Sequence, residues 1–145
     1  MEMDVVKVAE LVATMAHRGQ VDKSGVPYIE HPRAVARQLE TSVEKAVGYL
    51  HDTLEDTFLT EEDLRPVFGD VITDAVVAMT HLVYEDYFTY IERVSANPIA
   101  KRVKLADLTH NMDESRLILI TQHDRDRLEK YKRAYAYLSQ KEQPT

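Results

Sequence analysis

A histidine and three carboxylates lie within the six residues from His51 to Asp56, in the order His-Asp-Thr-Leu-Glu-Asp. The residues just before them, 46–50, read as the core of a helix, where an unpaired charge costs several kcal/mol. A divalent metal resolves this conflict, because clustered carboxylates and imidazole become its ligands. On one helix, His51 lies a turn from Glu55 and Asp52 a turn from Asp56. Since His51 and Asp52 diverge by about 100° around the axis, they bind one ion only together with residues from elsewhere.

Two further segments offer such residues. His31 follows a loop that holds two of the chain's four glycines, and it precedes a predicted helix. Asp107 and Asn111 are one turn apart on a predicted helix over 98–112, and Lys104 shares their face. The predicted ligands of one divalent ion are therefore two imidazoles and two carboxylates, His31, His51, Asp52 and Asp107.

Such a site predicts metal-assisted hydrolysis, most simply at phosphorus. A bound divalent ion lowers the pKa of water toward neutrality, and Glu55 and Asp56 are placed to orient or deprotonate that water. The chain has no cysteine, which excludes a thiolate site and favours Mn, Fe, Mg, Co or Zn held by nitrogen and oxygen.

Composition limits the partners. The chain has 145 residues, 44% of them hydrophobic and 30% charged, which suits one globular domain with a real core. Its net charge of -7 argues against broad binding to duplex nucleic acid, whereas a small phosphorylated substrate fits. Neither a signal peptide nor an apolar stretch of membrane-spanning length is found, so we expect a cytoplasmic protein without a membrane partner. No protein partner is indicated.

The elements that must position these residues are predicted to be helices, since no segment alternates with period two. Capping signals at Thr41 and Thr60 open two of them, and Gly69 ends the second. We predict one all-α domain over residues 1–145, with the metal site between helices and a frayed tail at 140–145. The remaining helices are expected at 4–18, 32–40, 70–82, 98–112, 114–120 and 124–139. The aromatic side chains of one further segment, Tyr84, Tyr87, Phe88 and Tyr90, are expected to lie mostly in the core.

A His, an adjacent His-Asp pair and a distant Asp resemble the pattern of HD-domain metal-dependent phosphohydrolases. Longer motifs make the resemblance more specific, and together they resemble the hydrolase domain of RelA/SpoT homologues over residues 5–138. They are Ala16 to Gln20, Lys23 to Pro32, His51 to Thr57, Val103 to Asp107 and His110 to Met112. The resemblance implies a stand-alone small alarmone hydrolase of HD fold. It would bind one Mn ion and remove the 3′-pyrophosphate of ppGpp or pppGpp, giving GDP or GTP and pyrophosphate.

The resemblance also assigns roles. The four predicted ligands match the family's metal ligands, and Glu55 and Asp56 match the pair that activates water and positions the pyrophosphate. Residues that match substrate contacts are Asn111 near the ribose, Lys104 and Tyr131 near the nucleotide or its phosphates, and Lys23 and Ser24 near the guanine. The chain departs from the family at Asp22, Leu108 and Asp113-Glu114, where relatives carry basic residues. These departures leave base recognition open.

Other readings remain. Taken alone, His31 reads as a structural turn residue, and Asp107 with Asn111 as an exposed helix pair. The same metal site could serve another nucleotide, for example as an NADPH 2′-phosphatase. The chain could also be a non-catalytic module that binds an alarmone or a partner protein. Among the other histidines, His17 and His110 are expected to orient ligands, and His81 and His123 to lie on the surface without a role.

Overall fold

The computed structural model of the chain describes residues 3–113 and 121–140. Within these ranges the chain is helical, and the one β-type contact is an isolated bridge between Val21 and Pro27. The predicted helix at 114–120 and the tail beyond residue 140 lie outside the described residues. No described helix combines the length and apolar character needed to cross a membrane. The helices are α1 (Val5–Ala16), α2 (Glu30–Arg37), α3 (Ser42–Leu50), α4 (Thr53–Asp56), α5 (Glu61–Ala78), α6 (Tyr87–Ser95), α7 (Pro98–Asn111) and α8 (Gln122–Leu138).

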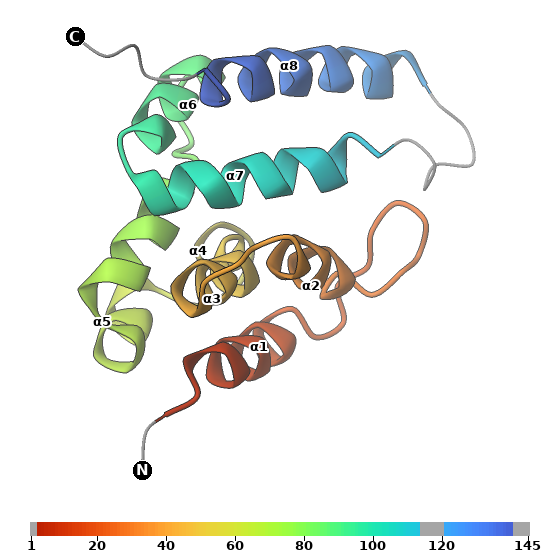
Figure 1. Ribbon diagram of the computed structural model, residues 1–145. Helices are drawn as coiled ribbons and strands as arrows, with labels where there is room; N and C mark the ends of the chain where they lie inside the picture. Colours follow the sequence, from red (N-terminus) through yellow and green to blue (C-terminus); the bar gives the residue numbers. More distant parts are fainter. Residues whose placement is uncertain (1–2, 114–120, 141–145) are drawn as a thin grey trace, which may run out of the picture.

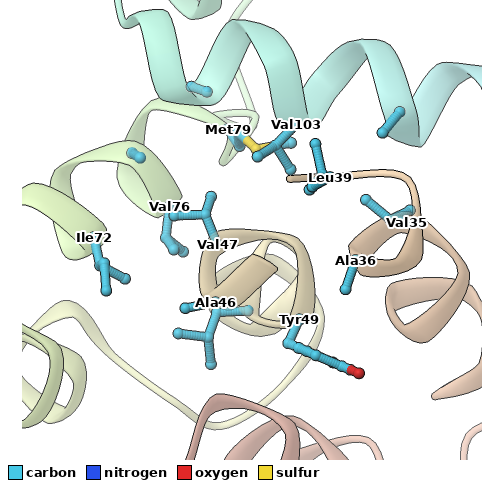
Figure 2. Packing of buried hydrophobic residues seen from close by; sticks show 14 of the residues in the cluster. Val35, Ala36, Leu39, Ala46, Val47, Tyr49, Ile72, Val76, Met79 and Val103 are labelled. Carbon is cyan, nitrogen blue, oxygen red and sulfur yellow. The ribbon is translucent and has the colours of Figure 1, made fainter. Parts of the chain in front are cut away.

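Helix α3 lies at the centre and packs against α1, α2, α5 and α7 (Figure 1). Its residues Ala46 and Val47 are fully buried, and Figure 2 shows them between Val35 of α2, Val76 of α5 and Val103 of α7. Full burial of a valine contributes about 1.5–3 kcal/mol. This core therefore fixes the C-terminal end of α3, where the His-Asp pair begins.

Helices α2 and α3 approach closely at Gly48. A Cβ added there would lie 3.1 Å from Leu39 Cδ1 and 3.2 Å from the Ala36 Cα. Glycine suits this crossing, because a methyl group would require Leu39 and the α2 backbone to shift by a few tenths of an ångström. The close approach brings His31 of α2 beside His51, which follows α3.

The capping predictions are confirmed. Thr41 and Thr60 each form a capping box, with Glu44 and Asp63 as the reciprocal partners. Gly69 has φ 82° and ψ 176°, a left-handed conformation that breaks α5 where the sequence predicted one helix to end and the next to begin. The second part of α5 ends at Ala78, four residues before the predicted Leu82.

Two expected helix boundaries near the site are wrong. The His51-Asp52 pair was predicted inside one continuous helix, but α3 ends at Leu50 and α4 begins at Thr53, so the pair lies in a turn. The Thr53 hydroxyl donates to the Leu50 carbonyl at 2.7 Å, a local bond that competes with continued helix.

The second boundary concerns α2. His31 was expected to precede a helix that starts at Pro32, but α2 begins at Glu30 and His31 lies in its first turn. Proline is tolerated throughout a first turn, so its position did not define the start.

Residues 87–95 form a helix, α6, where the sequence predicted only an aromatic segment. Asp86 caps it, since its carboxylate accepts from the backbone N–H groups of Phe88 and Thr89. Tyr90 is buried as expected, whereas Tyr84 is fully exposed. The helix brings Tyr87 and Tyr90 toward the predicted metal site.

Candidate metal centre

The four predicted ligands come together from three elements: α2, the turn between α3 and α4, and α7. His31 Nε2 lies 2.8 Å from Asp107 Oδ1. His51 Nε2 lies 3.1 Å from Asp52 Oδ2 and 3.4 Å from Asp107 Oδ1. One ligand atom from each of His31, His51 and Asp52 falls within 4.8 Å of the others, so these three could hold one metal ion.

The buried imidazole of His51 shows how the group fits a cation. Its Nδ1–H donates to the Gly48 carbonyl at 2.6 Å, which leaves the Nε2 lone pair facing the carboxylates. Nε2 is buried and has no hydrogen-bond partner in the described part of the chain. An unsatisfied buried polar atom costs about 1–3 kcal/mol. A divalent ion between this nitrogen and the carboxylates would satisfy all of them, so the residues present fit such an ion.

Neighbouring rings orient the other groups. His31 Nδ1 lies 2.7 Å from His110 Nδ1, and His31 Nε2 lies 2.8 Å from Asp107 Oδ1. An ion between Nε2 and Asp107 would replace the second bond, with His31 Nδ1 donating to His110. The Tyr28 hydroxyl donates to Asp52 Oδ2. Buried His17 contacts the Tyr28 ring in a tilted arrangement and bonds Gln20 at 2.9 Å. His110 thus contacts a predicted ligand directly, whereas His17 is one ring further away.

The electrostatics favour positive charge between the two carboxylates. Burial opposes ionisation of Asp52, but in the metal-free protein an imidazolium at His51 lowers the Asp52 pKa to about 2. Burial likewise opposes ionisation of Asp107, yet Lys104, 2.9 Å away, helps to hold its pKa well below the usual range. Burial would lower the pKa of His51, whereas both carboxylates raise it. These opposing effects describe a buried anionic pair that attracts a cation.

The two predicted water-activating carboxylates lie on α4. Burial raises the pKa of both Glu55 and Asp56, and the Asp52 charge adds to the shift. Glu55 Oε1 accepts the backbone N–H of His81 at 2.7 Å. The expectation that His81 is a surface residue without a role is therefore wrong: it is half-buried because the segment after α5 folds back over α4. His123 is exposed as expected.

Two cavities meet at this cluster. A cavity of roughly 320 Å³ contains four of the predicted substrate contacts, Lys23, Ser24, Asn111 and Tyr131, in its wall beside His31. A second cavity of roughly 200 Å³ is lined by His51, Asp52 and Glu55, and its wall contains the fifth predicted contact, Lys104. Tyr131 lines both. Asp56 lines neither, so its predicted contact with substrate has less geometric support than that of Glu55.

Lys23 is held by a carboxylate that the sequence did not single out. Asp124 Oδ1 lies 2.9 Å from Lys23 Nζ and 2.7 Å from an Arg127 guanidinium nitrogen. Its other oxygen accepts from the backbone and hydroxyl of Thr121, which caps α8. We call the contact of Asp124 with Lys23 and Arg127 the clasp. It joins the 21–27 loop to α8 across the wall of the larger cavity.

Asp22, which replaces a basic residue of relatives, shapes that loop. Its Oδ1 accepts the backbone N–H groups of Ser24 at 2.8 Å and Val26 at 3.0 Å. This is a turn in which an aspartate side chain stands in for a backbone acceptor. The carboxylate thus has a structural reason to be there, independent of the base.

No family model matches the chain. It is 42% identical over 123 residues to a GTP pyrophosphokinase of Streptomyces coelicolor, an alignment that covers 74% of the chain and 14% of that protein. It is 34% identical over 119 residues to the bifunctional (p)ppGpp synthase/hydrolase SpoT of Escherichia coli, covering 72% of the chain and 17% of SpoT. The chain thus spans less than a fifth of the length of these relatives.

A solved structure of a metazoan SpoT orthologue that hydrolyses ppGpp superposes with a TM-score of 0.78 and 22% sequence identity, over 95% of this chain and 86% of that one. This confirms the predicted all-α fold. The sequence relatives confirm the family that the motifs indicated: the chain belongs to the HD-domain family of RelA/SpoT homologues.

Proposed function

We propose that the chain is a metal-dependent hydrolase that removes the 3′-pyrophosphate of ppGpp or pppGpp and forms GDP or GTP. The observation that carries the proposal is His51 Nε2, which is buried and forms no hydrogen bond within the described residues although it lies 3.1 Å from Asp52 Oδ2 and 3.4 Å from Asp107 Oδ1. Two cavities are lined by residues of the same cluster. The hydrolase activity named for relatives supports it. Relatives with kinase names and relatives with hydrolase names are both matched over less than a fifth of their length, so the names alone do not choose between the two activities.

His31, His51, Asp52 and Asp107 would hold the ion, and manganese suits a site of imidazoles and carboxylates. A bound divalent ion supplies Lewis-acid activation of a water and of a phosphoryl oxygen. The chain itself keeps the ligands oriented. Lys104 and Asn111 each donate to Asp107, at 2.9 and 3.0 Å. This second layer of donors fixes the carboxylate before substrate arrives.

Glu55 is the group we assign as the proton acceptor for the attacking water. Burial raises its pKa toward the range in which a carboxylate both accepts and returns a proton. The His81 N–H holds one of its oxygens in place, and Glu55 lies in the wall of the smaller cavity beside Asp52. Asp56, one residue on, would position the phosphate chain.

The nucleoside fits the larger cavity. A volume of roughly 320 Å³ is in the range of small-molecule sites, and Ser24, Asn111 and Tyr131 offer polar and aromatic contacts there. With the base and ribose in this cavity, the 3′-phosphates would cross the cluster toward the smaller one. Guanine selectivity would then depend on the 21–27 loop.

A nucleotide panel tests the proposal. Purified protein with Mn is incubated with ppGpp, pppGpp, GTP and NADPH, and released pyrophosphate and orthophosphate are scored separately. Pyrophosphate from ppGpp or pppGpp is the expected result. Orthophosphate from NADPH alone would favour the rival phosphatase, and ppGpp that is bound but left intact would favour a non-catalytic module.

A further inference from the structure

The basic side chains around the two cavities differ in whether a carboxylate pairs with them. Lys23 and Arg127 share the Asp124 carboxylate, and Lys104 is paired with Asp107. Lys130 of α8 lines the smaller cavity, and the described residues place no carboxylate within ion-pair distance of it. In a chain of net charge -7, this leaves one uncompensated ammonium group beside the metal cluster.

Aromatic rings hold this ammonium group at the cavity. Lys130 Nζ lies 4.5 Å from the ring centroid of Tyr87 and 5.7 Å from that of Tyr131, both of which line the same cavity. Such contacts attract a cation to the ring face. The side chain is thus kept over the cavity although it is exposed.

A hydroxyl in the same wall also lacks a partner. The Tyr87 oxygen is buried, and nothing in the described ranges hydrogen-bonds to it. Buried hydroxyls normally have a partner, because an unmade bond is costly. Within the described residues, a cation without an ion pair and a donor without a hydrogen bond therefore line one cavity of roughly 200 Å³, together with His51 and Asp52.

We propose that this cavity is a pyrophosphate subsite, in which Lys130 and the Tyr87 hydroxyl bind the diphosphate that leaves the nucleotide. The inference rests on the proposed function and adds two residues to it. A diphosphate offers oxygens that accept from both groups at once, and charge-assisted bonds of this kind are the stronger class. Lys104 lines the same cavity, but its ammonium group is paired with Asp107, so Lys130 supplies the charge that remains for the diphosphate.

Calorimetric titration of pyrophosphate into the Mn-loaded protein tests this without turnover. Lys130→Met should weaken binding about tenfold and Tyr87→Phe by a similar factor, as expected for a lost bond to a charged group. Lys132→Met is the matched control, since it removes an exposed lysine two residues away that lines neither cavity, and it should change nothing. GDP affinity should be unchanged in all three variants.

The subsite would be overturned if pyrophosphate did not bind the wild-type protein, or if Lys132→Met weakened binding as much as Lys130→Met. Unaltered binding in both Lys130→Met and Tyr87→Phe would also overturn it. So would a loss of GDP affinity in place of pyrophosphate affinity, because the cavity would then bind the 5′-phosphates. Failure of the proposed function looks different. In that case pyrophosphate binds and depends on Lys130, but the wild-type protein leaves ppGpp intact.

Discussion

Replacing Lys104 by methionine tests whether a buried ammonium group holds Asp107 in its ionised form. The Lys104 side chain is 12% exposed, and its Nζ lies 2.9 Å from Asp107 Oδ2. The other carboxylate oxygen keeps two partners, His31 and Asn111. Methionine has a similar length and shape, so the substitution removes the charge and preserves most of the packing.

The expected loss follows from this geometry. At 2.9 Å and an effective dielectric constant of about 20, the attraction is roughly 6 kcal/mol before desolvation is subtracted. Removing one partner of a buried ion pair costs about 3–5 kcal/mol. Because Asp107 keeps His31 and Asn111, we expect the lower end, about 3 kcal/mol, for the metal-free protein. A bound divalent cation would supply the missing positive charge, so the loss should shrink when metal is present.

Urea unfolding of the wild-type and Lys104→Met proteins, in EDTA and in Mn, measures both effects. Lys101→Met on the same helix is the control, because the described residues give Lys101 no ion pair, and it should stay within about 0.5 kcal/mol of the wild type. An equal loss in the two variants would refute the ion-pair reasoning. A loss that Mn leaves unchanged would refute the link between Asp107 and a cation.

Three further changes have defined outcomes. Asp124→Asn should open the clasp and raise KM for ppGpp severalfold with kcat unchanged; steady-state kinetics with unchanged KM would contradict this. Glu85→Gln should lower the free energy of unfolding at pH 7, because hydrogen bonds from Arg93 lower the pKa of Glu85 to about 2. The difference in unfolding free energy from the wild type should shrink as pH falls from about 5 toward 2, which urea unfolding across this range measures. Gly48→Ala should lower the melting temperature and weaken Mn binding, because the new Cβ would lie 3.1 Å from Leu39 Cδ1 and shift α2 relative to α3. Calorimetry that finds the melting temperature and the Mn affinity unchanged would contradict this argument.

The sequence predicted the features that depend on local order. Capping residues such as Thr41 and Thr60 act within a single turn, so their helices begin where expected. The motif residues are brought together as the resemblance implied, while their roles as ligands stay a prediction. The break between α3 and α4, which contains His51 and Asp52, was missed, because apolar spacing does not show where a side-chain hydroxyl ends a helix.

Contacts across long sequence separations that no motif marks could not be foreseen. Asp124 is 101 residues from Lys23, and only the packing of α8 brings them together. His81 looked like a surface residue, because its contact with Glu55 is made through its backbone and depends on how the chain returns after α5. Lys130 is one of several charged residues on α8, and no local pattern marks it as the one that faces the site.

The most direct test of the central claim is product analysis of ppGpp incubated with the protein, with and without Mn, in the wild type and in Asp52→Ala. The proposed function predicts GDP and pyrophosphate in equal amounts, only with metal and only in the wild type. Intact ppGpp in the Mn-loaded wild-type protein, or equal turnover by Asp52→Ala, would contradict it.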